Sequence, residues 1–407
     1  MPPLRLLTFT TLYPHAGAPN FGVFVENRLR HLVATGQATS LIVAPVPWVP
    51  PLGTLNPAWA SWAGAPPVEQ RHGLTVQHPR YLAIPKFGMS VAPWLLYQPS
   101  WRAVAQYMRH TGQRFDIIDA HYAYPDGVAA VWLGRRLGLP VVITVLGSDV
   151  TEYPAFAVPR HLIRRAFDDA AAIITVSAGL RDAVVALGTD GSKVLVLRNG
   201  VDLDSFRPVQ DRAAVRAELG MDGPTLLSVG SLIERKGHGL VIEALTLLPG
   251  WRLKIIGSGP ERGSLQALAA RLGVADRMIM VGQVPHGSLP RYYAAADMLV
   301  LASQREGWAN VLLESMACGT PVIASPIPGN PEVVRERAAG LVMAERSARG
   351  VADAVRDLAS DPPGQAATRA YAERFSWAAT TQGQLNLFQA VVGLHRPVSS
   401  VMRLDDR

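Results

Sequence analysis

The chain has 407 residues, of which 49% are hydrophobic and 17% are charged. This composition provides for a sizeable core, excludes extensive disorder and suggests two or three domains. The single cysteine, Cys318, excludes a disulfide framework and a cysteine-based metal cluster. The net charge of +7 is uneven, because residues 1–200 carry 17 Lys plus Arg against 11 Asp plus Glu, whereas residues 201–407 carry 22 against 21.

The basic first half indicates an anionic ligand, which can be a phosphorylated substrate, anionic lipid or nucleic acid. Because the chain has no zinc-ligand spacing and no RNP-like segment, we expect no nucleic acid partner. It also has no recognisable secretory signal and no run of 18 apolar residues. We therefore expect a cytoplasmic protein without a membrane-spanning helix.

Short apolar strands alternate with longer helical patterns in the first half. The expected strands are Leu4–Thr8, Thr39–Ala44, Ile117–Ala120, Val141–Val145, Ala172–Val176 and Val194–Leu197. The helical patterns between them include Val23–Ala34, Gly127–Leu137 and Ala178–Leu187. The strands are continuous runs of Val, Ile and Leu, which is typical of parallel strands that are buried on both faces.

The second half repeats this rhythm. Its expected strands are Thr225–Val229, Arg252–Ile256, Met278–Val281, Met298–Leu301 and Val322–Ala324. Its helical patterns are Gly239–Leu247, Glu261–Leu272, Val311–Ala317 and a final one at Trp377–Val392. The alternation predicts an α/β fold with two Rossmann-like, doubly wound parallel sheets. Turn signals between Asn199 and Pro224 place the domains at residues 1–205 and 206–372, followed by a helix and tail at 373–407.

Two segments of the first half are rich in aromatic residues. Residues 46–67 contain Trp48, Trp59 and Trp62, and residues 84–108 contain Trp94, Tyr97, Trp101 and Tyr107 near Lys86, Arg102 and Arg109. Aromatic and basic side chains together are typical of an interfacial membrane surface. The alternative is that an insertion packs against the first domain, and the sequence leaves both interpretations open.

The strongest chemical signal is the segment from Glu306 to Glu314, which follows a buried strand and opens a helix near Asn310. Open α/β sheets bind ligands at the carboxyl ends of their strands, which is where Glu306 is expected. A helix start offers free N–H groups and a positive dipole end, which suit a phosphate. Glu314 lies on an otherwise apolar helix, where burying a carboxylate is costly unless the carboxylate binds something.

Two further loops of the second half follow strands. Arg235 and Lys236 lie in the loop after Thr225–Val229, where cations can neutralise a diphosphate leaving group. Gly257 and Gly259 follow the next strand and allow close backbone approach to a ligand. Arg262 stands where a dinucleotide-binding fingerprint has its third glycine, which argues against an NAD or FAD enzyme.

In the first half, three strand ends carry polar, glycine-bearing loops. They are residues 15–22, which end at Gly22, residues 119–127, which include His121, and residues 147–149, which end at Asp149. The short pattern of Asp202 and Asp204 matches an Asp-x-Asp metal motif, but a match of three residues is frequent by chance. We therefore predict no catalytic metal.

Taken in their order along the chain, these segments resemble the family 4 glycosyltransferases, which have the two-domain GT-B fold. The marks of the resemblance are Glu306–Glu314, Met316–Val322, Gly257–Pro260, Arg198–Asp202 and Arg235–Gly237. Residues 21–26 and 121–127 resemble a branch that makes bacterial surface polysaccharides. The resemblance covers nearly the whole chain.

The resemblance implies a retaining transferase that uses a UDP- or GDP-sugar in a cleft between the domains and needs no cofactor or metal. Glu306 would hold sugar hydroxyls, Glu314 the ribose, and Arg235 with Lys236 the diphosphate. The residues implied in donor binding are Gly22, Gly257, Gly259, Val284, Gly307, Trp308, Ala309, Asn310 and Glu314. The acceptor would be a glycan or lipid-linked sugar bound by the first domain, and the final helix would return to that domain.

Two positions depart from the family pattern. Ser231 stands where many members have an arginine, and Leu146 stands where many have a histidine near the donor sugar. Arg235 is expected to supply the first charge, and His121 or Asp149 is a candidate for sugar or acceptor contact. The alternatives are an inactive, sugar-nucleotide-binding subunit of a polysaccharide assembly complex, or another GT-B enzyme such as an epimerase or an inverting transferase.

Overall fold

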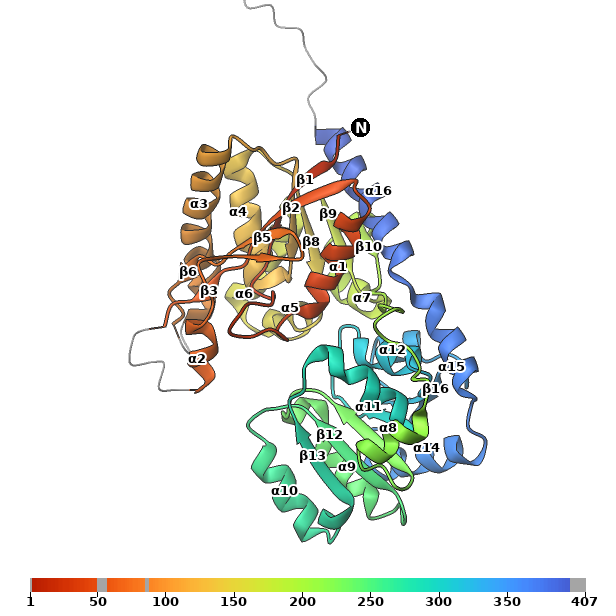
Figure 1. The fold of residues 1–407 in the computed structure, drawn as a ribbon. Coiled ribbons are helices and arrows are strands. Elements are labelled where there is room, and N and C mark those ends of the chain that lie inside the picture. Colours follow the sequence, from red (N-terminus) through yellow and green to blue (C-terminus); the bar gives the residue numbers. More distant parts are fainter. Residues whose placement is uncertain (1, 50–56, 85–87, 396–407) are drawn as a thin grey trace, which may run out of the picture. The chain divides into compact units, whose positions relative to one another are not determined.

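The computed structural model describes residues 2–49, 57–84 and 88–395 (Figure 1). Its backbone contacts divide the chain into two units. Unit 1 contains Met1–Val176, Arg181–Leu197 and the chain from Ala379 onward. Unit 2 contains Ser177–Leu180 and Arg198–Ala378. Apart from the short segment Ser177–Leu180, the chain therefore enters unit 2 at Arg198 and returns to unit 1 within its last helix.

Unit 1 is built on an eight-stranded sheet of order β10-β9-β8-β7-β1-β2-β5-β4. Its strands are β1 (Leu4–Phe9), β2 (Ala38–Val43), β4 (Val68–Arg71), β5 (Leu74–Gln77), β7 (Ile117–His121), β8 (Val141–Val145), β9 (Ala172–Thr175) and β10 (Val194–Val196). A separate parallel pair is formed by β3 (Val46–Pro47) and β6 (Arg80–Tyr81). The strands β1, β2 and β5 to β10 confirm the parallel arrangement that the sequence predicts.

The edge strand β4 differs from that expectation, because it runs antiparallel to β5. His72 and Gly73 join the two strands, and both have positive φ, at 50° and 79°. A two-residue turn of this kind matches the right-handed twist of a hairpin. The expectation of purely parallel sheets is therefore wrong at this edge of unit 1.

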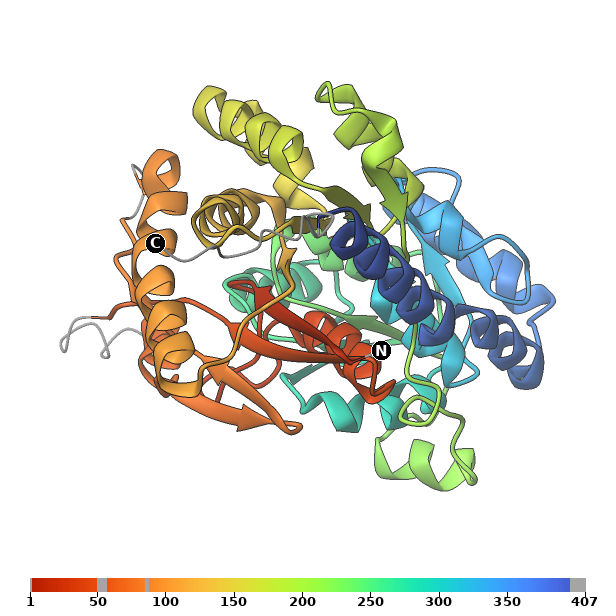
Figure 2. The ribbon, with the colours of Figure 1, turned by 90° about the horizontal axis from the view of Figure 1, so that it is seen from above.

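Helices cover both faces of the unit 1 sheet (Figure 2). The helices of this unit are α1 (Val23–Ala34), α2 (Pro57–Ala63), α3 (Ala92–Thr111), α4 (Val128–Leu137), α5 (Ser148–Thr151), α6 (Ala157–Asp169) and most of α7 (Ala178–Ala186) and α16 (Trp377–His395). Leu29 of α1 and Phe388 of α16 pack with Leu6, Ile42 and Val142 of the sheet in one core. The last helix thus returns to the first unit, as the sequence predicts.

Unit 2 has a six-stranded, all-parallel sheet of order β13-β12-β11-β14-β15-β16. Its strands are β11 (Thr225–Val229), β12 (Arg252–Ile256), β13 (Met278–Gly282), β14 (Met298–Leu301), β15 (Val322–Ala324) and β16 (Gly340–Val342). Its helices are α8 (Arg212–Glu218), α9 (His238–Leu245), α10 (Arg262–Arg271), α11 (Leu289–Ala295), α12 (Asn310–Ala317), α13 (Asn330–Val333), α14 (Ala348–Ser360) and α15 (Gln365–Ala372).

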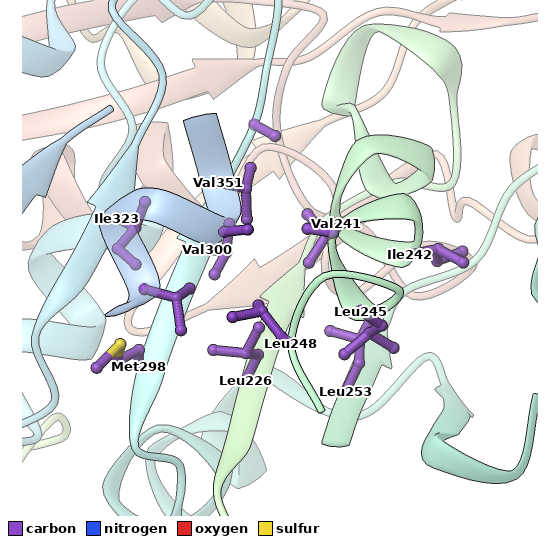
Figure 3. Packing of buried hydrophobic residues seen from close by; sticks show 14 of the residues in the cluster. Leu226, Val241, Ile242, Leu245, Leu248, Leu253, Met298, Val300, Ile323 and Val351 are labelled. Carbon is purple, nitrogen blue, oxygen red and sulfur yellow. The ribbon is translucent and has the colours of Figure 1, made fainter. Parts of the chain in front are cut away.

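The core of unit 2 lies between its sheet and helices α9 and α14 (Figure 3). Leu226 of β11, Leu253 of β12 and Val300 of β14 lie with Leu245 of α9 and Val351 of α14, and all five side chains are buried. Burial of a Val or Leu side chain stabilises a fold by about 1.5–3 kcal/mol. This packing holds the strands in register and so positions the loops at their carboxyl ends.

Among the described residues, none of the helices is both long enough and apolar enough to cross a membrane. The single cysteine, Cys318, is fully buried.

Candidate active site

The loops after β11 and β14 meet at the carboxyl edge of the unit 2 sheet, because these two strands are neighbours. Lys236 lies in the loop after β11 and Glu306 in the loop after β14. The Lys236 Nζ atom donates to Oε1 of Glu306 at 2.7 Å. Both side chains are only partly exposed, at 19% and 10%. The structure thus joins two of the predicted catalytic residues, which are 70 positions apart, in one ion pair.

Gly237 allows these two loops to approach each other. Its φ is +70°, and a Cβ atom placed on it would lie 2.0 Å from the carbonyl oxygen of Ala302. The adjoining backbones are also bonded, since the Gln304 N–H donates to the Arg235 carbonyl at 2.8 Å. The Arg235 guanidinium donates to the Arg305 carbonyl at 3.0 Å. Arg235 and Lys236 are therefore both held against the loop that carries Glu306.

Gly257 and Gly259 bring the loop after β12 against the loop after β11. A Cβ on Gly257 would lie 1.8 Å from the Gly230 carbonyl oxygen, and one on Gly259 would lie 2.4 Å from the Leu232 carbonyl oxygen. The Leu232 N–H donates to the Ser258 carbonyl at 2.9 Å. In this structure the two glycines thus serve contact between loops, and their contact with a ligand stays a prediction.

Glu314 lies in the second turn of α12 and is held by two residues that the sequence analysis did not single out. The buried Tyr293 hydroxyl donates to Oε2 of Glu314 at 2.9 Å, and His286 Nε2 lies 3.4 Å from Oε1. The His286 ring meets Phe206 edge-on at 5.3 Å between ring centroids. The Glu314 side chain remains 13% exposed, so this carboxylate is oriented and still reachable.

The residues between the two glutamates have mainly internal partners. The buried Trp308 indole donates to the Asn199 carbonyl at 3.1 Å, and Ala309 is buried beside it. The Asn199 side-chain amide donates to Oδ1 of Asn310, the first residue of α12, at 3.4 Å. Gly307 and Val284 are partly exposed. The helix start near Asn310 confirms the sequence-based expectation, and ligand contact by these residues stays a prediction.

Two other polar residues of unit 2, His238 and Asp202, form hydrogen bonds within the unit. His238 is buried, its Nε2 donates to the Ser231 carbonyl at 3.2 Å, and its Nδ1 lies 2.9 Å from the Ser228 hydroxyl. Burial lowers the His238 pKa to about 4, so the ring is neutral near pH 7. Asp202 accepts N–H bonds from Asp204 and Ser205 at 3.1 and 3.0 Å, which is the bonding of a local turn.

In unit 1, Gly22 caps α1 in a left-handed conformation with φ of +68°. A Cβ there would lie 2.4 Å from the carbonyl of Leu12, so the loop before α1 is tightly closed at this point. At the end of β7, the His121 Nε2 atom lies 3.0 Å from Oδ2 of Asp119, and both side chains are buried. Contacts within unit 1 therefore determine the conformation of the Gly22 loop and the orientation of the His121 side chain.

Asp149 is fully buried at the start of α5. Its carboxylate accepts N–H bonds from Gly147 at 2.6 Å, Ala123 at 2.8 Å and Leu146 at 3.1 Å. Burial raises the pKa of Asp149, and the backbone bonds oppose that rise. Asp149 thus ties together two strand-end loops of unit 1, while its contact with a sugar or acceptor stays a prediction.

Comparison with known proteins yields two family matches along the chain. Residues 22–205 match the model described as Glycosyltransferase Family 4, and residues 210–375 match the one described as Glycosyl transferases group 1. The teichuronic acid biosynthesis glycosyltransferase TuaC of Bacillus subtilis is 28% identical over 361 residues, which are 86% of this chain and 88% of that protein. The D-inositol 3-phosphate glycosyltransferase of Segniliparus rotundus is 33% identical over 309 residues, covering 70% of this chain and 68% of that protein.

A solved structure supports the fold assignment. Anabaena HepE in complex with UDP and glucose superposes with a TM-score of 0.72 at 18% sequence identity, over 95% of this chain and 100% of that one. Together with the two family matches, this similarity agrees with two sheet-based units and a final helix. The chain therefore belongs to the family 4 glycosyltransferases, and it is a glycosyltransferase of the GT-B fold.

Proposed function

We propose that the protein transfers a sugar from a UDP- or GDP-sugar to a glycan or lipid-linked acceptor with retention of anomeric configuration. The observation that carries this proposal is the ion pair between Lys236 Nζ and Glu306 Oε1, at 2.7 Å. It places a cation and a hydrogen-bond acceptor together where a parallel sheet binds ligands. A cation can bind the diphosphate and a carboxylate can accept hydrogen bonds from sugar hydroxyls, so this pair suits both parts of a nucleotide sugar.

In the proposed reaction the bond between the sugar C1 and the diphosphate oxygen breaks. The acceptor oxygen bonds C1 on the same face, and its proton passes to the departing phosphate oxygen. Lys236 and Arg235 stabilise the charge that develops on the diphosphate, which is often the largest catalytic contribution of an enzyme. Glu306 accepts hydrogen bonds from sugar hydroxyls. In this proposal no side chain acts as general base and no metal ion is needed.

The choice of donor and acceptor is supported by similar proteins. HepE forms complexes with UDP and with UDP-glucose, and TuaC is named for teichuronic acid biosynthesis. We therefore place this chain in surface polysaccharide biosynthesis and UDP first among the nucleotides to test. Glu314, braced by Tyr293 and His286, is the proposed partner of the ribose.

The proposal extends to contact with an anionic membrane through unit 1. Trp48, Leu82, Ile84, Val91 and Trp94 are between 44% and 53% exposed. The Trp48 N–H donates to the Tyr81 carbonyl at 2.7 Å, which places Trp48 beside the segment that carries Leu82. These apolar side chains belong to the net-basic half of the chain and suit a membrane interface.

Other aromatic residues of these segments pack internally. Trp62 lies against His15 and Phe21, with ring centroids 5.5 and 5.3 Å apart, and the Arg136 guanidinium lies 4.0 Å from the centre of the Trp101 ring. Lys86 lies outside the described residues. A Trp94→Ser variant should lose most co-flotation with anionic vesicles at low salt, whereas a Trp101→Phe variant should retain it. Equal flotation of both variants, or no flotation of the wild type, would reject the membrane contact.

The transfer itself is tested by a thermal-shift panel of UDP, GDP and NAD with and without magnesium, followed by NMR of the product anomer. A ligand that binds only the folded protein raises the melting temperature. A Lys236→Ala variant should lose about 100- to 1,000-fold in kcat, as when one transition-state donor is removed elsewhere. Arg252→Ala, at the amino end of β12, is the matched control. A normally active Lys236→Ala enzyme would refute the leaving-group role.

Ser231 and Leu146 favour one second candidate, which is an inactive subunit that binds sugar nucleotides. The Ser231 hydroxyl lacks the positive charge of the arginine that many family members have there, and the Leu146 side chain cannot make the hydrogen bond of the histidine. Nucleotide binding without turnover, in the presence of plausible acceptors, would support this candidate over the transferase.

A further inference from the structure

A cavity of about 530 Å³ lies within unit 1, between the segment from Pro67 to Arg80 and the second half of α3. Gln77, at the carboxyl end of β5, lines it. The strand β5 is parallel to β2, which is parallel to β1. The cavity therefore lies at the same edge of the sheet as the Gly22 loop, which is the edge where such sheets bind ligands. Its volume is within the range of small-molecule sites.

Arg80 gives the cavity a positive charge. Its guanidinium donates to the carbonyl oxygens of Trp62 at 2.7 Å and Pro47 at 3.3 Å, and to that of Ala65. Within the described part of the chain, no carboxylate forms an ion pair with Arg80, and its half-buried position lowers its pKa. Three carbonyl dipoles fix this cation in place, and none of them cancels its charge.

The carboxylate of Glu69, nearby on β4, is already engaged. His78 lines the cavity, and its Nε2 lies 2.8 Å from Oε1 of Glu69, while its Nδ1 lies 2.9 Å from the Ala44 carbonyl oxygen. The buried His15 ring is 5.8 Å from His78. Burial is the main cause that lowers the His15 pKa to about 4; repulsion by His78 adds to this shift, attraction by Glu69 opposes it, and repulsion by Arg80 contributes less.

Neutral polar groups and apolar walls complete the cavity. The Oε1 atom of Gln77 is buried and has no hydrogen-bond partner among the described residues, so a ligand hydroxyl would satisfy it. Gln106, Tyr107 and His110 line the opposite side from α3. The His110 Nδ1 atom bonds the Gln106 carbonyl oxygen at 2.7 Å, which leaves Nε2 for a ligand. Proline rings on the strand side suit the C–H face of a sugar.

We infer that this cavity binds an anionic sugar residue of the acceptor, with its carboxylate or phosphate towards Arg80 and His110 and a hydroxyl on Gln77. The inference rests on the proposed transferase function and narrows its acceptor to a class, namely a glycan that carries uronate or phosphate groups. Arg80 supplies the uncompensated charge, and hydrogen bonds to charged groups are stronger than those to neutral ones.

The test measures binding of three probes to the full chain by ligand-observed NMR at low salt: methyl β-glucuronide, glucose 6-phosphate and methyl β-glucoside. We expect one of the two anionic probes to bind about tenfold tighter than the neutral glucoside, which corresponds to about 1.4 kcal/mol. Preference for glucuronide would identify a uronate site, and preference for glucose 6-phosphate would identify a phosphate site. Equal binding of all three probes, or no binding of any, would overturn the inference.

Because Arg80 is bonded to three backbone carbonyls, replacing it would disturb the fold, and the test uses variants of exposed residues on α3 instead. His110→Ala and Gln106→Ala should each weaken the favoured probe severalfold, while Arg109→Ala, which removes an exposed cation outside the cavity, should leave its affinity within about twofold. Loss of affinity in Arg109→Ala alone would show general electrostatic attraction and reject the site. Binding of UDP and of GDP, measured in the same samples, separates the two proposals. Retained binding of either nucleotide without charge preference among the sugar probes rejects only this inference, whereas absence of binding to both nucleotides rejects the donor site.

Discussion

The Tyr293 hydroxyl provides a sensitive test of the Glu314 site, because a single oxygen atom can be removed without changing the ring packing. Tyr293 is fully buried, and its hydroxyl donates to Oε2 of Glu314 at 2.9 Å. The Tyr293→Phe change keeps the aromatic contact with Phe206, whose ring centroid is 6.1 Å away. It leaves Glu314 with the longer contact to His286, at 3.4 Å.

A hydrogen bond to a charged group contributes about 1.5–3 kcal/mol, and a buried acceptor that loses its donor retains the desolvation penalty. We expect part of this free energy to be lost from nucleotide binding as well, because the Glu314 carboxylate, without the Tyr293 hydrogen bond, must be ordered when the ribose binds. A loss of about 1 kcal/mol in binding free energy raises the UDP dissociation constant about fivefold. We expect the donor KM to rise by a similar factor with little change in kcat, since the ribose does not take part in bond cleavage.

Isothermal titration with UDP and steady-state kinetics measure these quantities, and chemical denaturation measures the accompanying loss of stability. Tyr292→Phe is the matched control, since it removes the same atom from the adjacent, partly exposed residue. Repeating the titration with 2′- and 3′-deoxy-UDP forms a double-mutant cycle between Tyr293 and the ribose. The proposed role of the Tyr293 hydroxyl in orienting Glu314 would be refuted by an unchanged UDP affinity in Tyr293→Phe. It would also be refuted if the effects of Tyr293→Phe and of removing a ribose hydroxyl on the binding free energy were additive for both deoxynucleotides.

Three further predictions concern stability and are measured by chemical denaturation. Gly237→Ala should destabilise the protein by about 2 kcal/mol or more, because the new Cβ would lie 2.0 Å from the Ala302 carbonyl oxygen. The control Gly250→Ala, where φ is +80° but the space around the residue is open, should lose only about 1 kcal/mol. Equal losses in the two variants would contradict the close approach at Gly237. The His238 pKa is about 4 in the folded protein and 6.5 in the unfolded chain, so the unfolded state binds more protons between pH 4 and pH 6.5. The free energy of unfolding should therefore fall by roughly 3 kcal/mol as the pH is lowered from 6.5 to about 4. His238→Asn should remove this part of the pH dependence. Asp149→Asn should cost about 2–4 kcal/mol, because an amide cannot accept all the backbone N–H bonds that the carboxylate receives, and a melting curve like that of the wild type would contradict this role.

Much of the fold could be predicted because its signals are local. The strands Val141–Val145, Thr225–Val229 and Arg252–Ile256 and the helix Val23–Ala34 have the same bounds in sequence and structure. Buried parallel strands are continuous apolar runs, and amphipathic helices repeat every 3.6 residues. The β4–β5 hairpin was missed, because its short, half-exposed strands adjoin a segment rich in Pro and Trp.

The candidate site was only partly accessible to sequence reasoning. The strand-end positions of Glu306 and Lys236 follow from local patterns, but their 2.7 Å contact does not, because it requires β11 and β14 to be neighbours in the sheet. Likewise, no local pattern relates Tyr293 and His286 to Glu314.

The sequence by itself therefore determined the α/β class, the order of most elements and the loops that carry charged residues, since backbone geometry and side-chain periodicity act over a few residues. Only the tertiary structure decided which of these loops meet, which carboxylates are occupied by backbone amides, as Asp149 is, and which cation remains uncompensated, as Arg80 does. These outcomes depend on strand order and on contacts between distant segments, where burial strengthens each electrostatic interaction and makes every missing partner costly.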